Sequence, residues 1–262
     1  MRKSITLLFV LLFCQTGYPR ILKRQIPDKL VVFTFDDATA SHYAVVAPLL
    51  KSYGFGGTFY VCEFGKNFRD TSKYMNWRQI RELDRMGFEV ANHTRSHPAV
   101  GRLPKDQVII QLKYIEDKCD SLGIVNPSTF AYPGYDLSQP VIEILSQRGY
   151  QFARAGGSRG YDPLTDHPLL VPSWAMTADN KVQIMESFKE ARDGKIVVLT
   201  IHGVPDIEHS WVNTPPDLFK EYLQYLFENH YKVVALRDLG KYIDVKMAMK
   251  RIVPDLTKKL KN

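Results

Sequence analysis

The chain has 262 residues, of which 45% are hydrophobic and 24% charged, so it is long enough to bury one sizeable core. Its formal net charge is +7, or +5 without Arg2 and Lys3 at the start of the chain. The Lys and Arg residues form no stripe with interleaved aromatic residues, which argues against a nucleic-acid-binding protein.

The first 17 residues have the layout of an export signal. A basic start is followed by an apolar stretch over 5–13, which is too short to span a bilayer as a permanent helix. We therefore expect a signal peptide over 1–17, no stable membrane span, and export to the periplasm, the cell envelope or the extracellular space. A lipoprotein attached through Cys14 is the less favoured alternative, because Phe13 is bulkier than the residue usual at that place.

Strand and helix patterns alternate along the rest of the chain. Strands are expected at Leu30–Phe35, Thr58–Val61, Phe88–Ala91, Thr129–Tyr132, Gln151–Arg154, Leu170–Ala175, Lys195–Ile201 and Val233–Leu236. Helices are expected at 41–53, 76–87, 104–122, 138–149, 181–192 and 214–229, with a last one from Leu239. Pro172 makes the sixth strand marginal, and the Gly-, Asp- and Pro-rich stretch 156–168 indicates a surface loop.

This alternation, without a repeat or a break in composition, fits either a single parallel barrel or a doubly wound sheet. Reactive residues follow five of the predicted strands, at Asp36, His93, Tyr132, Trp174 and His202. In a barrel the carboxyl ends of the strands meet on one face, whereas a flat sheet would spread these residues along an edge. We therefore expect an α/β barrel in a single domain, followed by a basic tail over 246–262.

The apolar run Leu30–Phe35 ends abruptly in two adjacent carboxylates, Asp36 and Asp37. Such a run is typical of a strand buried on both faces, and ligands of α/β folds lie at the carboxyl ends of these strands. Because neighbouring side chains on an extended segment point opposite ways, one carboxylate can bind a metal while the other faces its water. An N-cap of the next helix is the alternative for Asp37.

Two imidazoles, His93 and His97, stand four residues apart after the third predicted strand. Pro98 biases His97 away from helical backbone, so we expect a tight turn in which both rings converge. Alone, the pair would fit two solvated loop histidines equally well. With a carboxylate at another strand end, two histidines and one aspartate provide three ligands and leave a position for water, as in catalytic zinc sites. Cobalt and nickel suit the same donors.

The remaining reactive side chains are one histidine and two cysteines. His202 ends the most apolar strand, where a general acid is favoured over a satisfied core histidine. Buried free thiols are favoured over a disulfide for Cys62 and Cys119.

Taken in order, four short motifs resemble those of the polysaccharide deacetylase family, the NodB-homology group known as carbohydrate esterase family 4. They are Thr34-Phe35-Asp36-Asp37, His93-x-x-x-His97, Pro133-Gly134 and Leu199-Thr200-Ile201-His202. The resemblance implies a distorted (β/α)7 barrel, a deacetylase domain over 28–245, a Zn2+ cofactor (or Co2+ or Ni2+) and an N-acetylated glycan as substrate. It also implies that Asp36 is the catalytic base, that Asp37, His93 and His97 bind metal, and that His202 is the catalytic acid.

Two motifs depart from the family pattern. The third has Ala131 where many members carry the arginine that tunes the catalytic base, and the fourth survives only as Ser173-Trp174, without its aspartate. Arg154, after the fifth strand, is a candidate for the lost positive charge, although a surface or structural arginine is favoured.

The third motif and two tryptophans are candidates for oxyanion or substrate binding: Tyr132, Pro133, Gly134, Tyr135, Trp174 and Trp211. A backbone N–H near Gly134 can serve an oxyanion without any side chain. Ordinary loop packing is an equal alternative for Trp211.

We expect a metal-dependent hydrolase that removes N-acetyl groups from an amino-sugar polysaccharide or oligosaccharide and releases acetate. One alternative is another C–N hydrolase on the same fold, acting on a small cyclic imide or ureide. The other is a secreted carbohydrate-binding protein that has lost its activity. No oligomeric state is predicted.

Overall fold

The computed structural model describes residues 20–64 and 68–257. The predicted signal peptide and Cys14 lie outside these residues. The strands are β1 Leu30–Phe35, β2 Thr58–Val61, β3 Glu89–Asn92, β4 Thr129–Ala131, β5 Phe152–Arg154, β6 Trp174–Ala175, β7 Val197–Ile201 and β8 Lys232–Val234. The α-helices are α1 Ala47–Tyr53, α2 Trp77–Arg85, α3 Lys105–Ser121, α4 Gln139–Gln147, α5 Lys181–Phe188, α6 Pro216–Glu228 and α7 Val245–Arg251.

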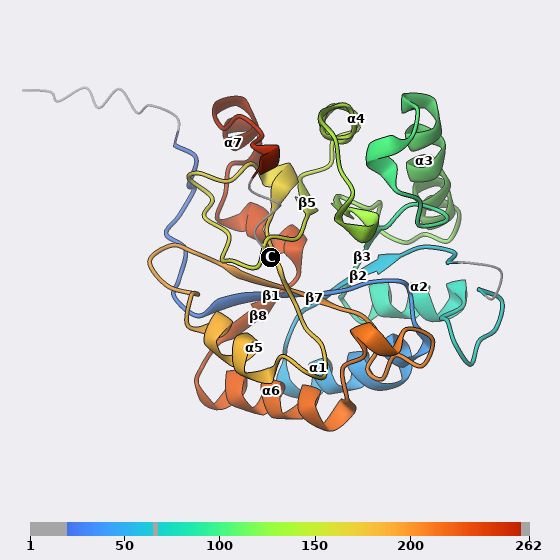
Figure 1. Ribbon diagram of the computed structural model, residues 1–262, viewed down its shortest axis with the longest axis vertical. Coiled ribbons are helices and arrows are strands. Elements are labelled where there is room, and N and C mark those ends of the chain that lie inside the picture. The colour runs from blue at the N-terminus through green and yellow to red at the C-terminus, as the bar shows by residue number, and fades with distance from the viewer. Residues whose placement is uncertain (1–19, 65–67, 258–262) are drawn as a thin grey trace, which may run out of the picture.

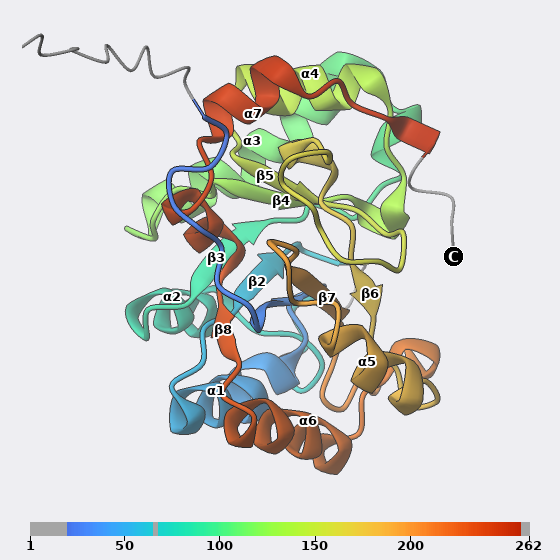
Figure 2. The ribbon, with the colours of Figure 1, turned by 90° about the vertical axis from the view of Figure 1, so that its left-hand side faces the viewer.

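All strand pairs of the sheet are parallel, in the order β5-β4-β3-β2-β1-β7-β6. The strand β8 pairs with the first half of β1, and β2 pairs with its second half. Helices α1, α5 and α6 lie at one end of the molecule, and α3, α4 and α7 lie at the opposite end (Figures 1 and 2). This is the distorted (β/α)7 barrel that the motifs predicted.

The predicted strand 170–175 joins the two edges of the curled sheet. Val171 exchanges backbone hydrogen bonds with Ala153 and Ala155 beside β5, and Trp174 and Ala175 pair with β7. Pro172 lies between these two short pairings and cannot donate a hydrogen bond. The segment is therefore irregular, as expected, and its irregularity lets it serve both edges.

The core explains why β1 is continuously apolar. Val31, Phe33 and Phe35 pack into one hydrophobic cluster with α1 and α6, while Leu30 and Val32 pack into a second cluster. Since side chains alternate along a strand, both faces of β1 are covered, and the whole strand is buried.

The C-terminal elements differ from the sequence-based expectation. The last strand ends at Val234 because the backbone N–H groups of Leu236 and Arg237 are taken by the Thr58 hydroxyl and the Glu89 carboxylate. A 3-10 turn, Leu236–Lys241, follows in place of the predicted helix from Leu239. Asp244 then caps α7 by accepting from Met247 N at 3.0 Å, so part of the predicted basic tail is a packed helix.

Two further observations concern predictions from the sequence. Cys62 and Cys119 are both buried free thiols, as favoured. Over residues 20–64 and 68–257, every helix is too short or too polar to cross a bilayer.

Candidate metal centre

The carboxyl ends of β1, β3 and β7 bring the predicted reactive residues together. Ligand atoms of Asp37, His93 and His97 all lie within 4.8 Å of one another. His202 approaches from β7, with its Nε2 3.9 Å from Asp37 Oδ2. Residues that are far apart in the sequence thus converge on one face of the barrel, as expected from its geometry.

The segment after β3 is a tight turn tied by side chains. Asn92 Oδ1 accepts a hydrogen bond from Thr94 N at 2.9 Å, and Thr94 Oγ1 accepts one from His97 N at 3.0 Å. Thr94 and His97 take the left-handed conformation, with φ of 66° and 54°. This turn holds the rings of His93 and His97 at a centroid distance of 4.8 Å, so the predicted convergence is confirmed.

His93 is oriented for metal binding. Its Nδ1 lies 2.9 Å from the carbonyl oxygen of Ala131 and donates to it, which leaves Nε2 as the ligand atom. That Nε2 is buried, lies 3.5 Å from Asp37 Oδ1 and has no hydrogen-bond partner among the described residues. Burial lowers the pKa of His93 to about 3, so the ring is neutral and able to ligate.

Asp37 lies at the centre of the group, and its Oδ1 is 3.5 Å and 3.6 Å from the Nε2 atoms of His93 and His97. Burial, followed by the charge of Asp36, raises the pKa of Asp37 to about 8. A divalent cation beside Asp37 would stabilise its ionised form against this effect. One carboxylate and two neutral imidazoles suit zinc, cobalt or nickel. An N-cap role for Asp37 is excluded, because the next helical turn begins at His42.

Arg154 supplies the positive charge that the third motif lacks. It is fully buried, contacts Asp36 Oδ2 through its Nη2, and its guanidinium carbon lies 5.6 Å and 5.4 Å from the rings of Tyr60 and Tyr135. Ala131 and Arg154 are direct partners in the β4–β5 register, so the charge has moved to the neighbouring strand at the same level.

The favoured interpretation of Arg154 as a surface or structural residue is therefore wrong. Since an unpaired buried charge is costly, the ion pair with Asp36 explains why this arginine is buried. Burial alone would raise the pKa of Asp36, but its electrostatic interactions, led by that with the Arg154 guanidinium, outweigh burial and lower the pKa to about 2. Asp36 is thus ionised at every physiological pH.

A cavity of about 270 Å³ opens over these groups. Of the residues predicted to bind substrate or oxyanion, Tyr132, Gly134, Tyr135 and Trp211 line it. Tyr132 is buried and its hydroxyl donates to Leu169 O at 2.9 Å, while Trp211 is 72% exposed at the rim. Pro133 and Trp174 are placed differently: Pro133 is buried, and Trp174 packs against the hydrophobic core.

The cavity is also lined by Phe64, which was missed from the sequence, and by His209 from the polar and aromatic loop after His202. The Phe64 ring lies 4.9 Å from His97 and 5.1 Å from His209, edge-on in both cases. Buried Asp206 accepts from the backbone N–H groups of Gly203 and His209, and so shapes the loop that carries His209. The density of polar and aromatic residues after His202 was the available signal for this wall.

The fold and the site agree with the comparisons to known proteins. The family model described as polysaccharide deacetylase matches residues 23–153, half of the chain. The chain belongs to this family, and that membership supports polysaccharide deacetylation as the general reaction. The match contains Asp36, Asp37, His93 and His97 but ends before His202.

Individual relatives are distant. The poly-beta-1,6-N-acetyl-D-glucosamine N-deacetylase of Escherichia coli (strain K12) is 26% identical over 169 residues, covering 48% of this chain and 25% of that protein. A solved Mycobacterium smegmatis structure named as a polysaccharide deacetylase has a TM-score of 0.63 at 17% identity, covering 90% of this chain and 96% of that one. Bacillus anthracis BA3943, a CE4 family pseudoenzyme, has a TM-score of 0.56 at 17% identity, covering 82% and 66%.

These similarities have a defined reach. The matches span only 25% to 43% of the length of three curated relatives. At 17% identity, the structural similarity shows the fold, which the BA3943 pseudoenzyme shares with its mutant of restored enzymatic activity. Activity therefore has to be argued from the residues of the site.

Proposed function

We propose that this protein is a metal-dependent hydrolase that removes N-acetyl groups from an amino-sugar glycan and releases acetate. The observation that carries the proposal is the cluster of Asp37, His93 and His97, whose ligand atoms lie within 4.8 Å of one another. Beside this cluster, Asp36 is held ionised by Arg154. Export to the cell envelope or beyond belongs to the same proposal, since polymeric glycans are found there.

Asp37, His93 and His97 would hold the cation, with Zn2+ favoured and Co2+ or Ni2+ as alternatives. A divalent cation bound there supplies Lewis acidity, which polarises the acetamide carbonyl and lowers the pKa of a water. The buried side chains of Asp37 and His93 orient the centre, and His97 completes it from the cavity side.

The chain's own residues then move the protons. Asp36 accepts the proton of the attacking water, and its free Oδ1, which has no hydrogen-bond partner among the described residues, is the accepting atom. The backbone near Gly134, which lines the cavity, donates a hydrogen bond to the developing oxyanion. His202 protonates the departing amine, and the C–N bond breaks to release acetate and the free amino sugar.

His202 is the least tuned of these groups. Burial lowers its pKa, so its imidazole is neutral until it takes up a proton for this transfer. The aspartate that the fourth motif lacks is not replaced by Trp174, which faces the core. Asp36 and buried Asp206 are the candidates for a compensating charge, because their negative charges oppose the effect of burial on the pKa of His202.

The test measures acetate release from N-acetylglucosamine oligomers, with and without a chelator and after adding back zinc. We expect release that the chelator abolishes and zinc restores. Binding of the oligomers without acetate release, at full metal occupancy, would instead identify a carbohydrate-binding protein. Chelator-sensitive hydrolysis of cyclic imides, with no acetate from any glycan, would identify the other C–N hydrolase.

A further inference from the structure

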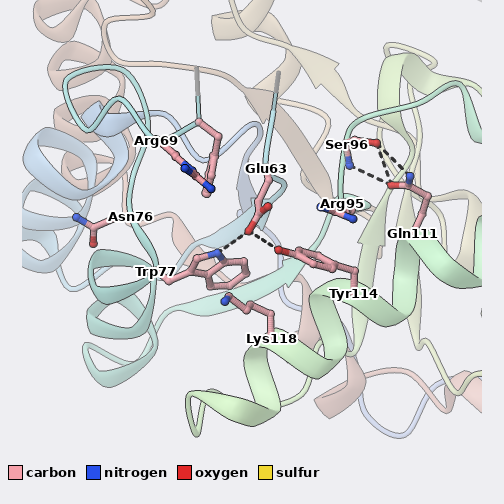
Figure 3. A pocket seen from close by; sticks show the side chains of 10 residues that line it. Glu63, Arg69, Asn76, Trp77, Arg95, Ser96, Gln111, Tyr114 and Lys118 are labelled. Carbon is pink, nitrogen blue, oxygen red and sulfur yellow. Dashed lines mark hydrogen bonds between the residues drawn. The ribbon is translucent and has the colours of Figure 1, made fainter. Parts of the chain in front are cut away.

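A second hollow lies beside the metal centre and is not used by the proposed reaction. This groove of about 800 Å³ is formed by the segments after β2 and β3 and by α2 and α3 (Figure 3). Its lining combines three aromatic rings, Phe68, Trp77 and Tyr114, with three cationic side chains, Arg69, Arg95 and Lys118. We call it the basic groove.

The basic groove and the catalytic cavity share a wall. Glu63 lines the groove and its neighbour Phe64 lines the cavity, while Ser96 lines the groove and its neighbour His97 lines the cavity. Glu63 N donates to Arg95 O at 2.6 Å, which joins the two segments. The groove and the cavity therefore lie on two sides of the same pair of segments.

The neutral and acidic groups of the groove are occupied within the protein. Glu63 Oε1 accepts from Trp77 Nε1 at 3.0 Å and from Tyr114 Oη at 2.7 Å, as Figure 3 shows. Gln111 is bonded to Ser96 through both its amide oxygen and its amide nitrogen. These contacts fix the two rings and the wall, and engage Oε1 of the carboxylate that lines the groove.

The cationic groups, by contrast, have no carboxylate partner. Within residues 20–64 and 68–257, Arg69, Arg95 and Lys118 form no ion pair. The guanidinium of Arg95 lies 4.3 Å from the centre of the Tyr114 ring, and Lys118 Nζ lies 5.8 Å from that of Trp77. A guanidinium stacked in this way keeps its N–H edge free for a planar carboxylate.

We propose that the basic groove binds a carboxylate on a sugar unit next to the one that is deacetylated, so that acidic N-acetylated glycans are preferred over neutral ones. The inference rests on the proposed function, because it places the same glycan at the metal centre and in the groove. Three cationic side chains surround the single carboxylate of Glu63, which already accepts hydrogen bonds from Trp77 and Tyr114. This excess of positive charge gives the groove its preference for an anion. The fixed rings of Trp77 and Tyr114 provide the apolar surface on which a sugar packs.

The test compares hexamers of N-acetylglucosamine with hexamers in which some C6 hydroxymethyl groups are oxidised to carboxylates. Binding is measured by calorimetry on the zinc-loaded Asp36→Asn chain, which does not consume the ligand. We expect the oxidised hexamer to bind several-fold more tightly, and the advantage to shrink as salt is raised. Lys118→Gln and Arg69→Gln should each reduce that advantage up to about fivefold without weakening the neutral hexamer.

Lys113→Gln is the matched control, since Lys113 lies on the same helix but pairs with Asp117 outside the groove. Equal binding of the two hexamers would overturn the proposal, as would an equal loss in the Lys113→Gln control. Acetate release is scored separately on the unmodified chain. A carboxylate preference without acetate release would sink the proposed function and leave the groove assignment standing, whereas release without the preference would do the reverse.

Discussion

The two ends of the same parallel sheet both bury carboxylates, and they treat them in opposite ways. At the amino end, Glu89 opens β3 and is 1% exposed. At the carboxyl end, Asp36 and Asp37 follow β1 and are 3% and 4% exposed. Burial is therefore the same at both ends, and any difference comes from the partners.

Glu89 is surrounded by neutral donors. The hydroxyls of Thr58 and Thr129 donate to it at 2.7 Å each, and Arg237 N donates at 2.9 Å. These donors come from β2, β4 and the turn after β8, so the carboxylate ties four segments of the barrel together. Its role is structural, because both of its oxygens accept hydrogen bonds from neighbouring segments.

The aspartates instead face imidazoles, a guanidinium and a cavity. Among the described residues, the Cys62 thiol donates a hydrogen bond to Asp37 Oδ1 at 3.8 Å. This hydrogen bond is long and weak. Asp37 and Ala38 also take the left-handed backbone conformation, with φ of 71° and 53°. At the carboxyl end the backbone is strained and the aspartate oxygens have few hydrogen-bond donors, whereas at the amino end Glu89 has its donors in place. This difference distinguishes a binding centre from a structural one.

The largest expected effect separates the two neighbouring aspartates. Asp37→Ala should lose the metal and the activity together, because it removes the central ligand of the cluster. Asp36→Asn should keep stoichiometric metal and lose about 10²–10⁴-fold in kcat, since it removes only the proton acceptor. Metal content by plasma mass spectrometry and acetate release check both variants. Full turnover in Asp36→Asn with metal retained would contradict the role of Asp36 as the base.

The next effect concerns the charge that moved from β4 to β5. Arg154→Met should lower kcat about 10²-fold with metal retained. Without the arginine, burial raises the pKa of Asp36, so Asp36 is ionised in a smaller fraction of the molecules. It should also cost about 3–5 kcal/mol of unfolding free energy, since Asp36 is left as an unpaired buried charge. Steady-state kinetics and urea unfolding measure the two effects.

Arg154→Lys is the matched control, because it retains the charge and loses the planar fork. It should recover part of both losses. The double variant Ala131→Arg, Arg154→Ala returns the charge to the third motif, and recovery there would show that the charge matters more than the strand that carries it. Wild-type kcat in Arg154→Met would refute the tuning role.

Arg154 also shows where prediction from sequence ended. The alternation of strands and helices predicted the barrel, and the position of each reactive residue after a strand predicted the cluster of Asp37, His93 and His97. The contact between Arg154 and Asp36 depends on Ala131 and Arg154 being register partners, and register is set by tertiary packing that no local pattern encodes.

The same limit explains the other differences. The strand β8 ends at Val234 because side chains of distant residues accept from the backbone N–H groups that follow it. Phe64 and His209 enter the cavity from two separate loops, and Asp206 shapes the loop that carries His209. Contacts that follow from the position of a residue at a strand end could be predicted, whereas contacts that depend on loop paths or on distant side chains could not.

The smallest expected effect lies at the structural end. Glu89→Gln should leave kcat and metal content unchanged and alter the unfolding free energy by only about 1 kcal/mol, because an amide can still accept from Arg237 N.

The sign of this change in the unfolding free energy should depend on pH. Burial raises the pKa of Glu89 in the folded chain above its usual value, so the folded state holds the proton more tightly than the unfolded state. The stability from this group is present below about pH 4 and declines as pH rises through the folded pKa. Urea unfolding of both proteins between pH 4 and 7 should thus show the Glu89→Gln variant gaining on the wild type as pH rises. A difference independent of pH would mean that the threonine hydroxyls and Arg237 N fully compensate the burial of the charge, and the contrast between the two ends of the sheet would then lie only in their cavities.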